Sequence, residues 1–240
     1  MIIRLVTTLP EFFDKPLSAG VVGKGINAGR LHIEIINLRD YTDDKHRSTD
    51  DYPFGGGAGM VMLPEPIFKA VRHIKREDPD AKFYLTSPKG KRFDQKTALT
   101  LSRQKSITFF CGRYEGVDER VRPLFDEELS IGDFVLSGGE IAALAMVDAV
   151  ARLIPGVLGN QESILEESFM GPILEYPQYT RPRVFEGKKV PDILLSGNHK
   201  KIMRYRRLEA LRRTRDRRPD LYAAAVLTED ELSLIKERSL

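Results

Sequence analysis

The stretch ITFFCGRYEGVDER at residues 107–120 decides the fold, because it joins a short apolar run to a glycine-containing turn. A second stretch of this kind, SIGDFVLSGGE at residues 130–140, leads into an apolar helix. Glycine is needed where φ is positive or where a ligand must approach the backbone closely. Open α/β sheets bind their ligands in loops at the carboxyl ends of strands. The two turns therefore predict an α/β fold whose ligand lies against these loops.

The spacing of the glycines excludes the common nucleotide-binding loops. Neither turn has the GxGxxG pattern of a dinucleotide fingerprint, and neither has the GxxxxGK[ST] pattern of a triphosphate-binding loop. A small, mostly uncharged ligand that is held by backbone groups fits these turns better than a nucleotide polyphosphate.

The first 160 residues alternate short apolar runs with helical patterns. The expected elements are strands at 2–7, 31–37, 82–86 and 107–111, and helices at 65–76 and 94–104. Short apolar runs bounded by turn signals are typical of buried parallel strands, and this alternation implies a parallel sheet covered by helices on both faces. The segment 141–154 is apolar nearly all round, so we expect a helix that is buried in the core or against a second subunit.

Length and composition indicate a globular protein with one large domain, or with a large domain and a small one. The chain has 240 residues, of which 41% are hydrophobic, and a single cysteine, Cys111. One cysteine excludes an intramolecular disulfide and fits a reducing compartment. The start of the sequence lacks a signal-peptide pattern, and its most apolar stretch is too short to span a bilayer. We therefore expect a cytoplasmic protein that does not bind membranes.

Positive charge is concentrated near the end of the chain. Residues 181–218 contain fourteen Lys or Arg and four Asp or Glu, a net charge of +10, whereas the rest of the chain carries −7. A basic region on an otherwise acidic protein is typical of a protein that binds a polyanion. Arginine pairs with phosphate through two hydrogen bonds, and an aromatic ring such as that of Tyr205 stacks on bases. A solvated helical face is the alternative, and we favour nucleic acid.

The predicted organisation has three parts: an α/β domain at 1–159, an interdomain linker at 160–172 and a small, basic, all-α domain at 173–240. The helices expected in the last part lie at 198–215, 220–226 and 228–237. The final helix begins with Thr228 and, three residues later, Glu231, which is the pattern of a capping box.

Several kinds of active site are excluded by the residue types present. Four scattered histidines and one cysteine do not form a zinc site, and there is no GxSxG nucleophile motif. A third glycine run, DDYPFGGGAGM at residues 50–60, has four glycines in five positions and cannot be the interior of a helix or strand. Its aromatic residues and Met60 favour a packed loop over a disordered one.

Seven motifs, in order along the whole chain, resemble the bacterial tRNA (guanine-N1)-methyltransferases that modify guanine 37, next to the anticodon. These motifs are HR at 46–47, DDYPFGGGAGM at 50–60, CGRYEGVDER at 111–120, SIGDFVLSGGE at 130–140, DAVARLIPGVLG at 148–159, YTRP at 179–182 and LLSGNH at 194–199. The family is one of the SPOUT methyltransferases. The resemblance implies that the α/β domain carries a deep trefoil knot, which the rarity of threaded chains argues against.

The resemblance also implies that S-adenosyl-L-methionine is the methyl donor and lies bent in the knot, held by three loops. Backbone groups of Ile131, Phe134 and Leu136 would hold the adenine, and Tyr114 and Pro88 would form apolar walls. The expected cofactor-binding residues are Leu85, Thr86, Ser87, Pro88, Gly112, Tyr114, Glu115, Gly116, Ser130, Ile131, Gly132, Phe134, Val135, Leu136, Gly138 and Gly139.

Methylation of guanine N1 needs a base and a cation, because the neutral nitrogen is a poor nucleophile and negative charge develops on O6. The resemblance assigns Arg152 as the catalytic cation, although its spacing from Asp148 also fits a surface ion pair. The family's usual aspartate is replaced here by Glu167, which we take as the catalytic base. Its extra methylene changes the reach, and a misplacement of about an ångström costs on the order of a hundredfold in rate. Glu166 is the alternative base.

The partner implied by the resemblance is tRNA, bound by a homodimer whose active site is shared between subunits. The expected tRNA-binding residues are Asp50, Gly57, Gly59, Ser163, Arg181, His199, Arg206 and Arg207. Glu115 either contacts the methionine part of the donor or caps the following helix. No protein metal site is expected, and no pattern bears on an added divalent ion such as magnesium. Two alternatives stay open: a non-catalytic RNA-binding protein, and a SPOUT methyltransferase with another RNA target.

Overall fold

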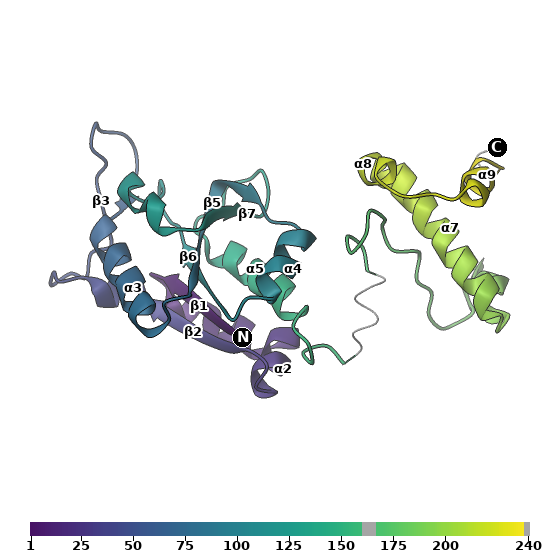
Figure 1. The fold of residues 1–240 in the computed structure, drawn as a ribbon, viewed down its shortest axis with the longest axis horizontal. Helices are drawn as coiled ribbons and strands as arrows, with labels where there is room; N and C mark the ends of the chain where they lie inside the picture. Colours follow the sequence, from purple (N-terminus) through teal and green to yellow (C-terminus); the bar gives the residue numbers. More distant parts are fainter. Residues whose placement is uncertain (160–166, 238–240) are drawn as a thin grey trace. The chain divides into compact units, whose positions relative to one another are not determined.

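The computed structural model describes residues 1–159 and 167–237 and forms two compact units, residues 1–161 and 162–240 (Figure 1). Each unit is described on its own. None of the helices in the described ranges is both long and apolar enough to cross a membrane.

The first unit is built on a five-stranded sheet in which every neighbouring pair is parallel. Its strands are β1 (Ile2–Thr7), β2 (His32–Asn37), β5 (Lys82–Arg92), β6 (Ser106–Cys111) and β7 (Glu127–Ser130). They lie in the order β2-β1-β6-β5-β7, so β6 is the central strand and pairs with β1 on one side and β5 on the other. The prediction of a parallel sheet from alternating strands and helices is confirmed. Sequence analysis missed β7, because two of its four residues are glutamates at the edge of the sheet.

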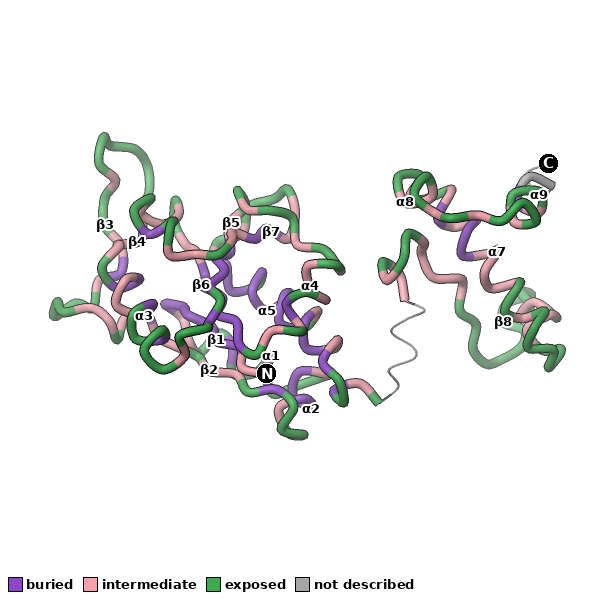
Figure 2. Tube along the Cα trace, viewed as in Figure 1, coloured by how far each residue is buried: buried purple, intermediate pink, exposed green. Residues whose placement is uncertain are grey.

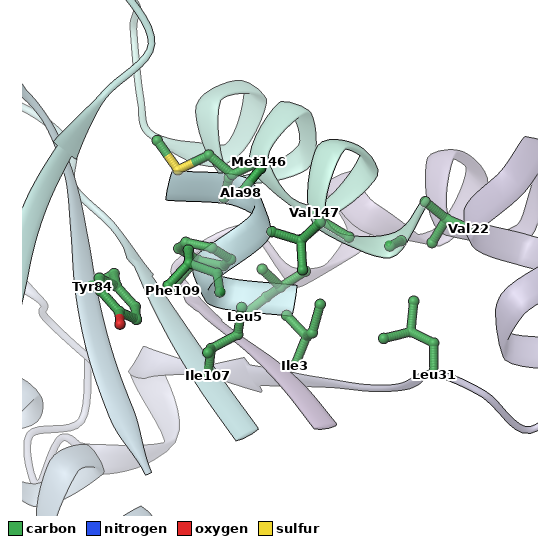
Figure 3. Close-up of a cluster of buried hydrophobic side chains, with 14 of the residues drawn as sticks. Ile3, Leu5, Val22, Leu31, Tyr84, Ala98, Ile107, Phe109, Met146 and Val147 are labelled. Carbon is green, nitrogen blue, oxygen red and sulfur yellow. The ribbon is translucent and has the colours of Figure 1, made fainter. Parts of the chain in front are cut away.

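Helices cover both faces of this sheet, and each face carries its own core. The helices α2 (Gly20–Asn27), α4 (Gln95–Ser102) and α5 (Glu140–Ala151) pack on one face, and α3 (Pro64–Glu77) packs on the other (Figure 1). Side chains from α5, α4 and the central strands interlock in the first core (Figure 3). The remaining short elements are η1 (Pro10–Phe13), α1 (Asp14–Ser18), η2 (Leu38–Tyr41), β3 (Asp50–Asp51), β4 (Val61–Met62) and η3 (Glu119–Leu124).

The all-round apolar helix α5 divides its surface between core and solvent. Met146, Val147 and Val150 are fully buried against the sheet. Ile141 remains 48% exposed, and Ala145, one turn further along, is also exposed. Figure 2 shows the buried segments concentrated in the central strands and along α5. The sequence left open whether the core or a second subunit covers this helix, and in the single chain the core covers one side only.

The second unit is mostly helical. Its helices are η4 (Asp192–Leu195), α7 (His199–Arg217), α8 (Pro219–Ala223) and α9 (Glu229–Glu237). The capping box at the start of α9 is confirmed, since the Glu231 N–H donates to Thr228 Oγ1 and the Thr228 N–H donates to the Glu231 carboxylate.

The expectation that this unit is entirely α-helical is wrong at one place. A small antiparallel hairpin joins β8 (Val184–Phe185) to β9 (Lys188–Lys189). The two residues between the strands, Glu186 and Gly187, both have positive φ, at 48° and 76°. Two left-handed residues in succession match the twist of a tight hairpin, and the glycine makes this turn accessible.

Candidate functional site

Residues 85–89 of β5 and the loops that follow β6 and β7 form the walls of one pocket of about 160 Å³ in the first unit. The sequence placed the end of this strand at residue 86, but β5 continues to Arg92 and its pairing with β7 is irregular between Thr86 and Lys91. Every residue that the sequence assigned to the cofactor lines this pocket: Leu85, Thr86, Ser87, Pro88, Gly112, Tyr114, Glu115, Gly116, Ser130, Ile131, Gly132, Phe134, Val135, Leu136, Gly138 and Gly139. The structure thus brings this set together, and the ligand it holds stays a prediction.

These three segments meet so closely that only glycine fits at their junction. The Gly139 N–H donates to the Gly112 carbonyl at 2.7 Å. A Cβ atom on Gly139 would overlap the Thr86 hydroxyl, and one on Gly112 would lie 2.7 Å from the Thr86 carbonyl oxygen. The absence of side chains at these two positions therefore allows Thr86 of β5 and the loop after β6 to contact the start of α5.

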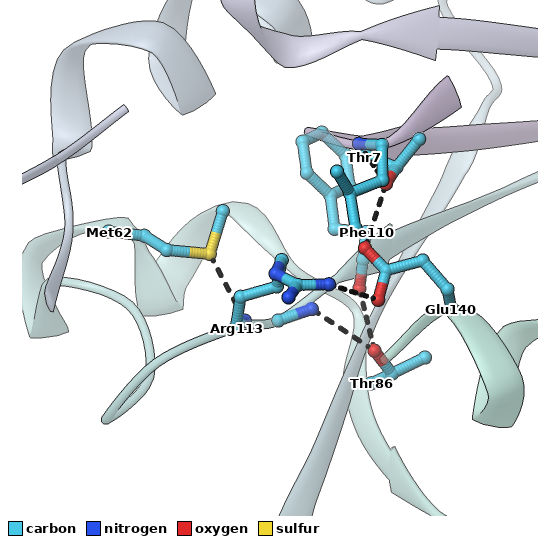
Figure 4. A network of polar contacts seen from close by, with 8 residues as sticks. Thr7, Met62, Thr86, Phe110, Arg113 and Glu140 are labelled. Carbon is cyan, nitrogen blue, oxygen red and sulfur yellow. Dashed lines mark hydrogen bonds and ion pairs between the residues drawn. The ribbon is translucent and has the colours of Figure 1, made fainter. Parts of the chain in front are cut away.

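A buried carboxylate stands beside this junction (Figure 4). Glu140 is only 3% exposed, and its two oxygens accept hydrogen bonds from Thr7 Oγ1 at 2.8 Å and from the Arg113 guanidinium at 3.1 Å. A buried charge is tolerated when it is paired and hydrogen-bonded, as it is here. The network links β1, the loop after β6 and α5 into one rigid support for the pocket.

Thr86 extends the same network toward the pocket floor. Its hydroxyl donates to the Phe110 carbonyl at 3.1 Å and accepts the Gly112 N–H at 3.2 Å (Figure 4). Sequence analysis assigned Thr86 to the ligand but missed Arg113 and Glu140 altogether. The one signal available was the glutamate in the first turn of a helix whose next seven residues are all apolar.

Tyr114 lies at the rim of the pocket in a strained conformation. Its φ of 56° is in the left-handed region, which is uncommon for a residue with a large side chain. Burial, and next a hydrogen bond with Asp50, raise the pKa of the Tyr114 hydroxyl above its usual value. Asp50 was expected to contact the RNA, and the structure places it against a residue of the pocket.

The glycine-rich loop between β3 and β4 borders the pocket. The Glu115 N–H donates to the Met60 carbonyl at 3.0 Å, and the Glu115 side chain covers Gly59 so closely that a Cβ there would lie 2.6 Å from it. The expectation of a packed loop is confirmed only at the Met60 end and is wrong for the aromatic residues, since Tyr52 is 79% exposed and Phe54 is 100% exposed. Gly57, also expected to contact RNA, is exposed and has only Pro53 near it.

The expected RNA-binding residues of the second unit divide into two groups. Arg181, His199 and Arg206 line one groove. Arg207 instead pairs with Glu231 at 2.9 Å and donates to the Val226 carbonyl, so it holds the start of α9.

The two expected catalytic residues belong to different units. Arg152 is half-buried at the C-terminal end of α5 in the first unit. Glu167 is half-buried in the second unit. The next residue, Ser168, fixes this turn by accepting a hydrogen bond at its Oγ from the Glu175 N–H at 3.0 Å. The alternative base Glu166 and the expected RNA residue Ser163 lie outside the described residues. Within 1–159 and 167–237, His, Cys, Asp and Glu side chains form no cluster suited to a metal ion.

Comparison with known proteins gives consistent matches over nearly the whole chain. The profile of the family tRNA (Guanine-1)-methyltransferase TrmD matches residues 1–224. The tRNA (guanine-N(1)-)-methyltransferase of Dictyoglomus turgidum is 56% identical over 98% of this chain and 95% of its own length. The proteins of that name from Caldanaerobacter subterraneus subsp. tengcongensis and Pediococcus pentosaceus are 49% and 47% identical, each over 99% of this chain and 98% of its own length.

The Gly139 junction predicts a specific sensitivity to a single methyl group. Gly139→Ala should lower the free energy of unfolding by about 1–3 kcal/mol or more, because the overpacked methyl must displace Thr86 or Gly112. Gly159→Ala is the matched control, since a Cβ there meets nothing within 4 Å. Urea denaturation of both variants measures the difference, and equal stability of the two would contradict the close packing described.

Proposed function

The chain belongs to the tRNA (guanine-1)-methyltransferase family, and on that premise we propose that it transfers a methyl group from S-adenosyl-L-methionine to N1 of guanine 37 in tRNA. The observation that carries this proposal is the pocket, whose lining contains the complete set of residues that the family resemblance assigned to the donor. The test is methyl transfer to tRNA that carries guanine or adenine at position 37, with the modified nucleoside identified by mass spectrometry.

The pocket suits S-adenosyl-L-methionine on chemical grounds. The loop that contains Ile131, Phe134 and Leu136 offers backbone groups and apolar side chains to an adenine, and Pro88 and Tyr114 supply further apolar wall. Backbone groups at a glycine junction approach a ligand closely, which favours a bent ligand held without strong charge pairing. When bound, the donor supplies a methyl group activated by a sulfonium. We assign the trefoil knot of the SPOUT fold to the same three segments that line the pocket.

Catalysis in this proposal rests on two charged side chains. Glu167 accepts the N1 proton of the guanine, which gives the nitrogen the electron pair that attacks the methyl carbon. Arg152 stabilises the negative charge that develops on O6 as that proton leaves. With the donor bound in the pocket, formation of the bond from N1 to the methyl carbon would break the bond from sulfur to that carbon, and the donor would leave as a neutral thioether that keeps the bonding electrons.

The exposed side of α5 supports a homodimer with a shared active site. Ile141 and Ala145 face solvent in the single chain beside the half-buried Leu144, and contiguous exposed apolar surface marks interaction sites. Because α5 also begins at the glycine junction, a partner bound here would lie next to the pocket.

Two alternatives remain distinguishable by experiment. A non-catalytic RNA-binding protein would bind tRNA without methylating it, and the intact pocket argues against that function. A SPOUT methyltransferase with another RNA target would methylate a different nucleoside, which mass spectrometry of total RNA reveals.

The role of Glu167 predicts a large kinetic effect. Glu167→Gln should slow the single-turnover rate of methyl transfer by about a hundred- to ten-thousandfold, which is the usual contribution of a general base. Donor affinity measured by calorimetry should stay unchanged. Glu167→Asp restores the family's residue: a slower rate than the native enzyme indicates that this chain compensates for the longer side chain, and an equal or faster rate indicates that glutamate is merely tolerated. Normal turnover of Glu167→Gln with loss in Glu166→Gln would move the base to Glu166.

The basic surface predicts salt-dependent tRNA binding. Lys200, Lys201 and Arg204 are exposed on α7, so replacing all three by alanine should weaken tRNA binding. The slope of log affinity against log salt should fall by about 0.7–0.9 for each phosphate that is no longer neutralised. Lys200→Arg/Lys201→Arg/Arg204→Lys keeps the charge and should bind normally. Arg207 is a poor target because its removal also frees Glu231. An unchanged salt slope would contradict phosphate binding by these side chains.

The dimer predicts a surface variant that separates the subunits. Ile141→Asp should convert a dimer at micromolar concentration to a monomer in sedimentation velocity and reduce methyl transfer, since a buried unpaired carboxylate opposes association. Val226→Asp, at a residue 87% exposed in the other unit, is the control and should remain dimeric. A native protein that is monomeric and fully active would disprove the shared site.

A further inference from the structure

A groove of about 720 Å³ in the second unit has no part in the chemistry proposed above. It lies between the segment at 176–183 and the first turns of α7, and we call it the unit-2 groove. Its volume lies within the roughly 300–1,000 Å³ of ordinary ligand pockets, so the kind of occupant follows from the residues that line it.

The charge of the unit-2 groove favours an anionic occupant. Arg181, Arg183, Arg206 and His199 all line it, and none of the described residues that line it carries a carboxylate. Arginine recognises phosphate with a planar fork of donors, so the phosphates of a nucleic acid fit this lining.

Aromatic and apolar side chains stand exposed among these cations. The Arg206 guanidinium lies 4.8 Å from the centre of the Tyr176 ring, and its buried Nε has no hydrogen-bond partner in the part of the chain that is described. Tyr179 is 47% exposed and Met203 is 66% exposed, and both line the groove. Exposed aromatic and apolar side chains do not pair with phosphates, so this surface is suited to more than phosphate binding.

Arg206 stacked on Tyr176, the exposed ring of Tyr179 and the nearby cations favour single-stranded RNA over duplex RNA. The bases of a duplex are stacked on one another and present only edges and phosphates, so exposed rings gain little from a duplex. Unpaired nucleotides offer both base faces, and aromatic rings and arginine planes stack on them.

We propose that the unit-2 groove binds unpaired nucleotides of the RNA substrate, with a base stacked on Tyr179 and the adjoining phosphates paired with Arg181 and Arg183. This inference deepens the proposed function and depends on it for the identity of the RNA. The second unit is then a reader of single-stranded RNA as well as a phosphate-binding surface.

Binding of short RNAs to the full-length protein tests the proposal. A fluorescein-labelled single-stranded RNA and a blunt duplex of the same length are titrated by fluorescence anisotropy. Tyr179→Ala should weaken single-strand binding by about fivefold or more, the scale of one base stack, and leave duplex binding within about twofold. Tyr179→Phe keeps the ring and should bind normally. Arg217→Ala removes one charge at the exposed end of α7, outside the groove, and should affect both RNAs weakly and alike.

Thermal unfolding of each variant excludes a folding defect, and sedimentation shows whether the oligomeric state changes. Equal single-strand affinity of Tyr179→Ala and native protein, or equal weakening for single strand and duplex, would overturn the inference. Conversion of a dimer to a monomer by Tyr179→Ala would assign the groove to a second copy of the chain and also overturn it. Methyl transfer to tRNA by the native protein is measured separately, so the proposed function and the groove can fail independently.

Discussion

The structure depends most on the contact of Gly139 with Gly112 and Thr86. There the chain after β7 passes against Thr86 of β5 and against the loop that follows β6, at a distance that leaves no room for a side chain. Thr86, Gly112 and Gly139 all line the pocket, so this contact forms part of its wall. Protein interiors are packed so tightly that even one methylene is felt, so a methyl group at the junction would push the walls apart.

Close packing at the junction also explains the charged network beneath it. Glu140 follows Gly139 directly and is carried into the interior with its carboxylate. Breaking a buried pair by removing one partner costs about 3–5 kcal/mol, so Thr7 and Arg113 are required once the backbone has placed the acid there. A local need for glycine thus sets a requirement for a threonine on β1 and an arginine after β6.

The concave surfaces of the two units are lined by different residue types. The first has a pocket of backbone groups and apolar walls, which suits the small ligand proposed for it, for which shape is decisive. The second carries exposed cations and open rings, which suit a long anionic polymer, where charge acts over a distance and stacking acts on contact. The hairpin at β8 and β9 lies in this basic segment and was missed because strands of two residues carry no detectable periodicity.

The amino-acid sequence alone determined the strands β1 and β6, the first half of β5, the helices α3, α5 and α7, the capping box of α9 and the residues that line the pocket. Each of these follows from neighbours in the chain: apolar periodicity, capping residues and the backbone freedom of glycine. Only the tertiary structure decided the strand order β2-β1-β6-β5-β7, the pairing of Glu140 with Arg113, and the commitment of Arg207 to Glu231. These depend on contacts between residues far apart in the chain, which form because folding buries them together and which no local pattern encodes.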